Sequence, residues 1–291
     1  MTTTPPESHH KVMAYGPTGA GKTRFALSVL EYLRDVRQLK PEEVYFGFVD
    51  NDGGLDELLE GGLVDPDWIK CIDHVVCSNW KEVTENTARM LKKAKEYQAK
   101  YGKFNGWVVA DNVGIAWNWT RDQYSLEVHG KYEEQHAADV RQELVQAGTP
   151  NKMAPTFDGR KEYPIITSMH ARWADGIKLS GVNFVFLSPI SSFKQDEESD
   201  EVVKAKGQKD NEYRVSHILK FYMEDEFGDT KYYVDLEKNR SFGRFFKRSP
   251  PTGKGLTYAQ FRRWLDRNSP AALKAAEEAK KAAAPSPEVK A

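Results

Sequence analysis

The chain has 291 residues, of which 40% are hydrophobic and 29% charged, and its formal net charge is −1. That length suffices for one large domain with a full core. A charge so close to zero excludes a strong global field, so any surface for nucleic acid must be local. The 2 cysteines exclude a disulfide scaffold. Because the chain has no run of about 20 apolar residues, we expect a cytoplasmic protein with no membrane contact.

Short apolar runs alternate with amphipathic stretches along the first two thirds of the chain. Such alternation predicts an α/β fold with a mainly parallel sheet flanked by helices. Residues 1–10 are polar and predict a flexible leader. The predicted strands are 11–15, 44–49, 107–110 and 181–187, and the predicted helices between them are 22–39 and 80–100.

The rest of the chain has weaker patterns. We expect an inserted helical region at 112–180, a flexible acidic and basic loop at 194–212, and a hairpin of two late strands that turns at Gly228–Asp229. The Ala-, Lys- and Pro-rich residues 268–291 predict a disordered tail. One domain is therefore expected over residues 11–267.

A complete phosphate-binding motif follows the first predicted strand and opens the first predicted helix. Its glycines allow the backbone to curl around a phosphate chain, and the helix presents its positive end to the same anion. Lys22 can reach the β- and γ-phosphates, and the Thr23 hydroxyl can coordinate Mg²⁺. The predicted cradle consists of Gly16, Pro17, Thr18, Gly19, Ala20, Gly21, Lys22 and Thr23.

Carboxylates follow two further predicted strands, where an open sheet places its ligands. Asp111 ends the strand 107–110 and is the candidate metal-side acid; the alternative is an acid that merely ends a strand. Asp52 follows the strand 44–49 and is the candidate base that orients water. Asp50 is a second acid for the metal side, and a purely structural role of this turn is the alternative.

These motifs, in this order, resemble the RecA-like branch of the P-loop ATPases. More narrowly, the chain resembles phage-type nucleotide-binding proteins that work beside single-strand annealing proteins. The resemblance implies a water-activating acid at Asp52, where Glu is usual, and a metal-side Asp at Asp111. It implies a polar sensor at Ser188 or Ser191. It also implies that Lys238 and Arg240 reach the γ-phosphate of a neighbouring subunit, with an exposed basic hairpin as the alternative.

The resemblance implies a Mg²⁺-dependent ATPase of phage or viral DNA metabolism, acting in recombination or strand annealing. Its expected partners are ATP, DNA (single-stranded more than double-stranded), further copies of the chain, and a phage annealing or replication protein in the host cytoplasm. The chain lacks a guanine-selecting Asn-Lys-x-Asp run after the core, which favours ATP. Two alternatives stay open: a nucleotide-gated binding module with little hydrolysis, and a viral DNA-packaging motor.

Residues 231–267 contain 10 basic residues against 3 acidic ones, with aromatic residues between them. Cations mixed with rings are typical of surfaces for single-stranded nucleic acid. The alternative is that 256–265 spaces its rings as the packing face of a helix.

Three further groups of side chains favour structural roles. Cys71, His74 and Cys77 favour buried thiols over a zinc site. Trp117, Trp119 and Tyr124 favour packing over a partner-facing loop. The histidines without ligand spacing are His129, His136 and His170.

Overall fold

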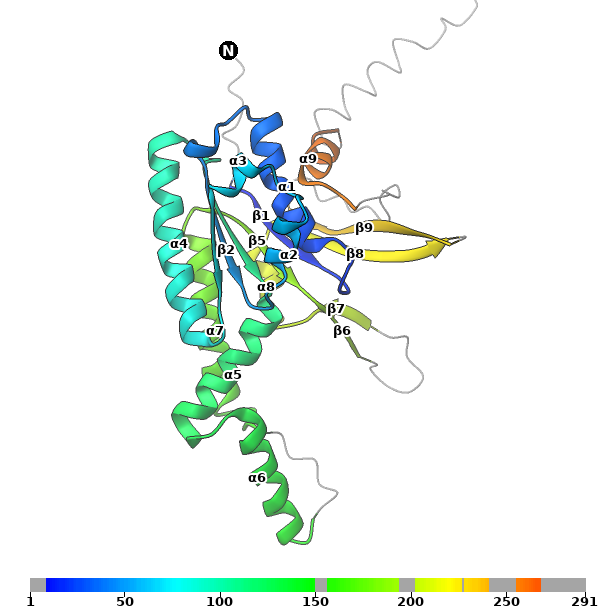
Figure 1. Ribbon diagram of the computed structural model, residues 1–291. Helices are drawn as coiled ribbons and strands as arrows, with labels where there is room; N and C mark the ends of the chain where they lie inside the picture. The colour runs from blue at the N-terminus through cyan, green and yellow to red at the C-terminus, as the bar shows by residue number, and fades with distance from the viewer. Residues whose placement is uncertain (1–8, 150–155, 194–201, 227, 241–254, 268–291) are drawn as a thin grey trace, which may run out of the picture.

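The computed structural model describes residues 9–149, 156–193, 202–226, 228–240 and 255–267. Seven strands form the main sheet in the order β3-β2-β4-β5-β1-β8-β9 (Figure 1), and β6 (Ile190–Phe193) and β7 (Val202–Ala205) form a separate antiparallel pair. All neighbours in the main sheet are parallel except β8 and β9. Its strands are β1 (Lys11–Tyr15), β2 (Tyr45–Asp50), β3 (Ile72–Val76), β4 (Gly106–Asp111), β5 (Asn183–Ser188), β8 (His217–Glu226) and β9 (Asp229–Asn239).

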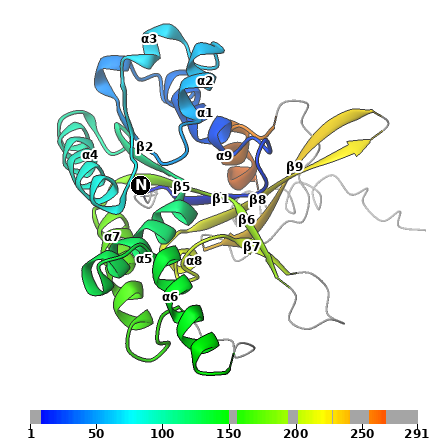
Figure 2. The ribbon, with the colours of Figure 1, turned by 60° about the horizontal axis from the view of Figure 1, so that its bottom comes forward.

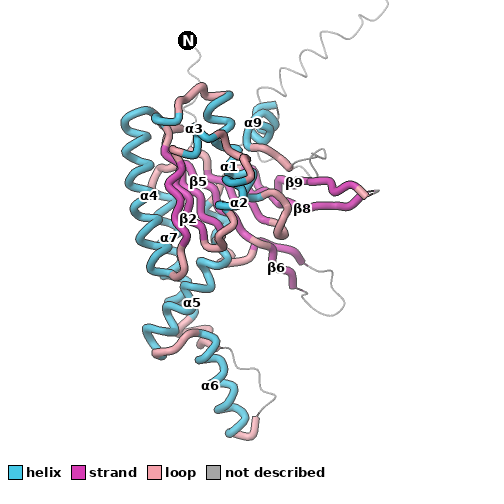
Figure 3. Tube along the Cα trace, in the orientation of Figure 1, coloured by secondary structure: helices cyan, strands magenta, loops and turns pink. Residues whose placement is uncertain are grey.

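Helices cover both faces of the sheet (Figures 2 and 3). One face carries α1 (Lys22–Asp35), α2 (Leu55–Glu60), α3 (Pro66–Ile69) and α9 (Tyr258–Arg267), and the other carries α4 (Trp80–Tyr101), α5 (Val113–His129) and α7 (Tyr163–Leu179). The remaining helical elements are η1 (Pro41–Glu43), α6 (Glu133–Gln146) and α8 (Asn211–Arg214). Helix α6 buries none of its residues and projects from the body of the molecule.

The central strands are apolar on both sides, as expected for parallel strands between two helical layers. Every residue of β2, β4 and β5 is buried. Two glycines allow α4 to lie directly on this sheet. A Cβ on Gly106 would lie 2.2 Å from the carbonyl oxygen of Ala94, and one on Gly47 would lie 3.0 Å from the Met90 side chain.

The predicted α/β class is confirmed. The sheet is mainly parallel and flanked by helices, with inserted helices α5, α6 and α7 and a C-terminal hairpin of β8 and β9. The four predicted core strands correspond to β1, β2, β4 and β5. None of the described helices is long and apolar enough to cross a membrane.

The structure differs from the sequence-based expectations in three places. Strand β3 was not predicted, because it is a half-buried edge strand without a strong apolar pattern. The expected loop 194–212 contains β7, which pairs with β6, and the start of α8. In the expected leader, His10 is buried and its backbone N–H donates to Asn183.

Most described aromatic residues of the basic segment 231–267 belong to the core. Tyr258 and Phe261 are buried on α9 against α1, and the Tyr258 backbone N–H donates to Ser28 at 2.7 Å. Tyr233 is buried on β9. The packing alternative therefore holds for α9, while Phe242, Phe245 and Phe246 lie outside the described residues.

Burial of His170 predicts a loss of stability in acid. The ring is fully buried where α7 packs against α4, α5 and α8, and burial, with the nearby Arg214 charge, lowers its pKa from 6.5 to about 3. The unfolded chain binds a proton below pH 6.5 while the folded one does not, so this group lowers the free energy of unfolding by about 2 kcal/mol between pH 7 and pH 5.

We expect His170→Gln to remove that part of the pH dependence. Urea unfolding of both proteins at pH 7 and pH 5 measures it, because the other titrating groups cancel in the comparison. An equal loss of stability in the two proteins would contradict the prediction.

Candidate functional site

The glycine-rich loop 16–23 joins β1 to α1 in the conformation that a phosphate cradle needs. Gly19 and Gly21 have φ values of +81° and +89°, which favour glycine. Helix α1 begins at Lys22, and no side chain caps its amino end. The first N–H groups of the helix are thus available to an anion.

The side chain of Lys22 folds back over the glycine-rich loop that precedes it. Its Nζ donates to the carbonyl oxygens of Gly16 at 3.0 Å and Pro17 at 2.8 Å. Burial lowers the pKa of Lys22, while the charges of Asp111 and Asp52 act in the opposite direction. The ammonium therefore lies beside both predicted acids.

Thr23 and Asp111 meet although they are far apart in the sequence. The Thr23 hydroxyl donates to Asp111 Oδ2 at 3.0 Å, which links the start of α1 to the end of β4. Burial, followed by the charge of Asp52, raises the pKa of Asp111 to about 7. A hydroxyl and a buried carboxylate suit a hard cation such as Mg²⁺, whose charge would stabilise the ionised acid. The residues present therefore fit the ion.

Asp50 holds the turn after β2. Its carboxylate is fully buried and accepts hydrogen bonds from the backbone N–H groups of Asp52 (3.0 Å), Gly53 (2.8 Å) and Leu55 (3.2 Å). The ring of His74 lies 3.2 Å from the same carboxylate. These contacts support the structural alternative for Asp50 over a metal-side role.

Asp52 lies at the surface of this turn, and its carboxylate lines the pocket beside the cradle. Asn112 Nδ2 donates to Asp52 Oδ2 at 3.3 Å, and the backbone N–H of Gly54 donates to the other oxygen at 3.4 Å. Partial burial, with the charge of Asp50, raises the pKa of Asp52. A raised pKa makes the carboxylate a stronger base once it is ionised.

The cradle, Asp52 and Asp111 share one pocket of about 560 Å³. Sequence analysis did not identify Arg24, Glu57, Asn112 and Pro189, which also line it. The signal for Asn112 was present in the sequence, since Asp-Asn follows both β2 and β4. The strand register places Asp50 beside Asp111, and Asn51 donates to the Asn112 carbonyl oxygen at 3.1 Å.

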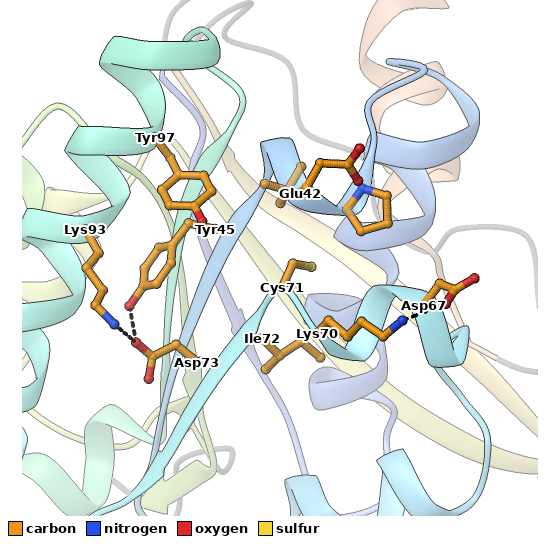
Figure 4. A pocket seen from close by; sticks show the side chains of 11 residues that line it. Glu42, Tyr45, Asp67, Lys70, Cys71, Ile72, Asp73, Lys93 and Tyr97 are labelled. Carbon is orange, nitrogen blue, oxygen red and sulfur yellow. Dashed lines mark hydrogen bonds and ion pairs between the residues drawn. The ribbon is translucent and has the colours of Figure 1, made fainter.

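A second pocket, of about 740 Å³, lies at the opposite end of the strands, where β2 and β3 begin (Figure 4). Most of its charged side chains are paired with one another. Asp73 accepts hydrogen bonds from Tyr45 (2.8 Å) and Lys93 (3.2 Å), and Lys70 pairs with Asp67 at 3.0 Å. The cradle pocket, which contains the uncapped start of α1 beside Asp52 and Asp111, is therefore the candidate functional site.

Lys238 and Arg240 lie far from the cradle of their own chain. Lys238 lies in the part of β9 that pairs with the start of β8, and Arg240 follows β9, at the sheet end where β1 begins. Lys238 donates to the carbonyl oxygen of Glu212, and Arg240 donates to that of Tyr213 at 2.8 Å. Their predicted action on a neighbouring subunit stays a prediction.

The other groups singled out from the sequence have mainly structural contacts. Ser188 is buried and donates to the Lys206 carbonyl oxygen at 2.7 Å. Its hydroxyl is therefore already used in a structural hydrogen bond. Tyr124 is buried, and Trp117 and Trp119 pack against core clusters. Burial raises the pKa of Cys71 to about 12 and of Cys77 to about 11.

No protein-family model matches the chain, and no curated protein matches it. Solved structures with a similar fold include the KaiC-like protein PH0186 of the hyperthermophilic archaeon Pyrococcus horikoshii OT3, with 14% identity, a TM-score of 0.45, and coverage of 84% of this chain and 87% of that chain. The RadB recombinase has 14% identity and a TM-score of 0.45, over 85% of this chain and 90% of that chain. These similarities concern the fold alone.

Gly16 is predicted to tolerate no side chain. A Cβ at this position would lie 2.3 Å from the carbonyl oxygen of Phe221 in β8, so Gly16→Ala should lower the free energy of unfolding by about 2 kcal/mol or more. Gly54→Ala is the matched control, because its Cβ would find its nearest neighbour at 3.5 Å. Chemical denaturation measures the free energy of unfolding of both variants. Equal values for Gly16→Ala and Gly54→Ala would contradict the close approach of β8 to Gly16.

Proposed function

We propose that the protein is a Mg²⁺-dependent ATPase of the RecA-like type. The observation that carries the proposal is the Thr23–Asp111 hydrogen bond beside Lys22. It joins the hydroxyl and the carboxylate expected to hold the metal, within one pocket that also contains the phosphate cradle. Strand β5 lies between β1, which leads into the cradle, and β4, which ends at Asp111. The cradle and Asp111 are therefore separated by the width of one strand, and this spacing supports the proposal.

Each residue has a defined task in this proposal. The loop amides and Lys22 bind the phosphates, and Thr23 and Asp111 hold Mg²⁺. When bound, Mg²⁺ would supply positive charge that neutralises the charge developing on the phosphates. Asp52 orients the attacking water and accepts its proton, and Asn112 holds the Asp52 carboxylate in place.

The wider context belongs to the same proposal. ATP turnover would regulate a DNA transaction of a phage or virus, such as recombination or strand annealing, in an assembly of several copies. In that assembly Lys238 and Arg240 would act either on the site of the neighbouring subunit or on the DNA. DNA-stimulated phosphate release supports this role, whereas turnover unchanged by DNA contradicts it. Binding to a capsid portal in place of DNA would identify the packaging motor.

A second candidate function is a nucleotide-gated binding module with little hydrolysis. Two observations favour it. An Asp is one methylene shorter than the usual Glu, and the Asp52 carboxylate already accepts hydrogen bonds from Asn112 and Gly54. Ser188, moreover, donates to backbone carbonyl oxygens.

Lys22→Ala should lower ATP affinity by about a hundredfold or more, because the amides alone leave the phosphate charge uncompensated. Titration with a fluorescent ATP analogue measures the change. Lys95→Ala on the exposed side of α4 is the control and should bind as the parent protein does. Unchanged affinity in Lys22→Ala would refute the cradle.

Asp52→Ala separates the two candidate functions. If Asp52 is the base, its loss should lower kcat about 10²- to 10⁴-fold with little change in ATP affinity. A parent protein with turnover at the background rate, together with an Asp52→Ala variant that is unchanged in every respect, would establish the binding module. Faster turnover in Asp52→Glu would show that the reach of the carboxylate limits the rate.

A further inference from the structure

Four cations gather at the sheet end opposite the cradle. Lys11 opens β1, Lys178 lies near the end of α7, Lys238 is on β9, and Arg240 follows β9. Backbone hydrogen bonds fix their spacing: the Ser216 N–H donates to the Lys11 carbonyl oxygen at 2.8 Å, and the Arg240 N–H donates to that of Ser216 at 3.0 Å. Lys11 Nζ also donates to the Lys178 carbonyl oxygen at 3.0 Å.

These cations lack acidic partners in the described part of the chain. No described carboxylate lies within 4.0 Å of their charged groups, and their hydrogen bonds go to backbone carbonyl oxygens. Burial, with the charges of Lys178 and Arg240, lowers the pKa of Lys11. Burial, followed by the charge of Arg240, also lowers the pKa of Lys238, against the opposing charge of Glu212. A group of mutually repelling cations is stabilised by an anionic ligand.

An exposed aromatic ring lies beside the cations. Tyr213 of α8 is 66% exposed, although large aromatic residues elsewhere in the fold are mostly buried. Lys238 Nζ lies 5.7 Å from the centre of its ring, and the Tyr213 backbone carbonyl oxygen accepts the hydrogen bond from Arg240. The ring is thus held next to the cations with its surface open to a ligand.

We propose that Lys11, Lys178, Lys238, Arg240 and Tyr213 form a binding surface for single-stranded nucleic acid. The cations bind successive backbone phosphates, and the Tyr213 ring stacks on an unpaired base. This inference deepens the DNA part of the proposed function by giving it a site, and it does not require ATP hydrolysis. The proximity of four cations favours a chain of phosphates over the single γ-phosphate of a neighbouring subunit.

The test measures binding of a fluorescent oligo(dT) by anisotropy at several salt concentrations, without nucleotide. Four phosphate contacts predict a slope of log K against log[salt] of about −3, and Lys178→Gln/Arg240→Gln should make it shallower by about 1.4 while weakening binding about tenfold or more. The matched control is Lys92→Gln/Lys95→Gln, which removes the same charge from the exposed side of α4.

The ring has its own pair of variants. Tyr213→Ala should weaken binding about tenfold, whereas Tyr213→Phe, which keeps the stacking surface, should bind as the parent protein does. Thermal unfolding of each variant confirms that the fold is retained.

The outcomes separate this inference from the proposed ATPase. Loss of oligo(dT) binding in the cation pair and in Tyr213→Ala, with ATP affinity unchanged, supports the surface. Affinity and salt slope equal to those of the parent protein overturn it, as does a parent protein that binds ATP but no oligo(dT). Variants that bind oligo(dT) normally but lose ATP turnover at high protein concentration would assign the cations to a neighbour's phosphate and overturn the inference. If Lys22→Ala kept the ATP affinity of the parent protein, that result would refute the phosphate cradle but would not affect the nucleic-acid surface.

Discussion

The contact between Thr23 and Asp111 is the interaction on which the arrangement of the candidate site depends. It joins the first turn of α1 to the end of β4, across a sheet in which β5 separates β4 from the cradle strand β1. The hydrogen bonds of Lys22 Nζ to the carbonyl oxygens of Gly16 and Pro17 hold the ammonium on the same side of the sheet end. The glycine-rich loop, Asp111 and the turn after β2 therefore line a single pocket.

The carboxylates of Asp50, Asp52 and Asp111 lie close together, and a bound Mg²⁺ ion would reduce the repulsion between their charges. Burial, followed by the charges of Asp52 and Asp50, raises the pKa of Asp111, and burial, followed by the charge of Asp50, raises that of Asp52. Asp50 already accepts several backbone hydrogen bonds, so the turn is rigid before any ligand binds. Lys22 supplies one positive charge near these carboxylates. A divalent cation would stabilise their ionised forms, and the cradle amides would hold the phosphates that accompany it.

The two ends of the parallel sheet thus carry opposite chemistry. The carboxyl ends of β2 and β4 present acids beside the glycine-rich loop that follows β1. The start of β1, the end of β9 and α8 present cations and an exposed ring. If the proposed surface binds single-stranded nucleic acid, the nucleotide and the nucleic acid would contact the same sheet at its two ends. β1 and β8 connect them, since Gly16 lies against the backbone of Phe221 at one end and Lys11 lies beside Ser216 at the other.

The sequence by itself determined the α/β class, the glycine-rich loop between a strand and a helix, and the place of Asp111 at the end of a buried strand. These features depend on local signals: a contiguous glycine-rich motif, and short apolar runs that alternate with amphipathic helices. Tertiary structure decided what depends on register and packing. Only the pairing of β2 with β4 placed Asn112 beside Asp52. The aromatic rings of α9 are buried only because α9 packs against α1. The four cations lie close together only because β1, α7, α8 and β9 are neighbours in the fold. Such contacts join residues far apart in the chain, and no local pattern encodes them.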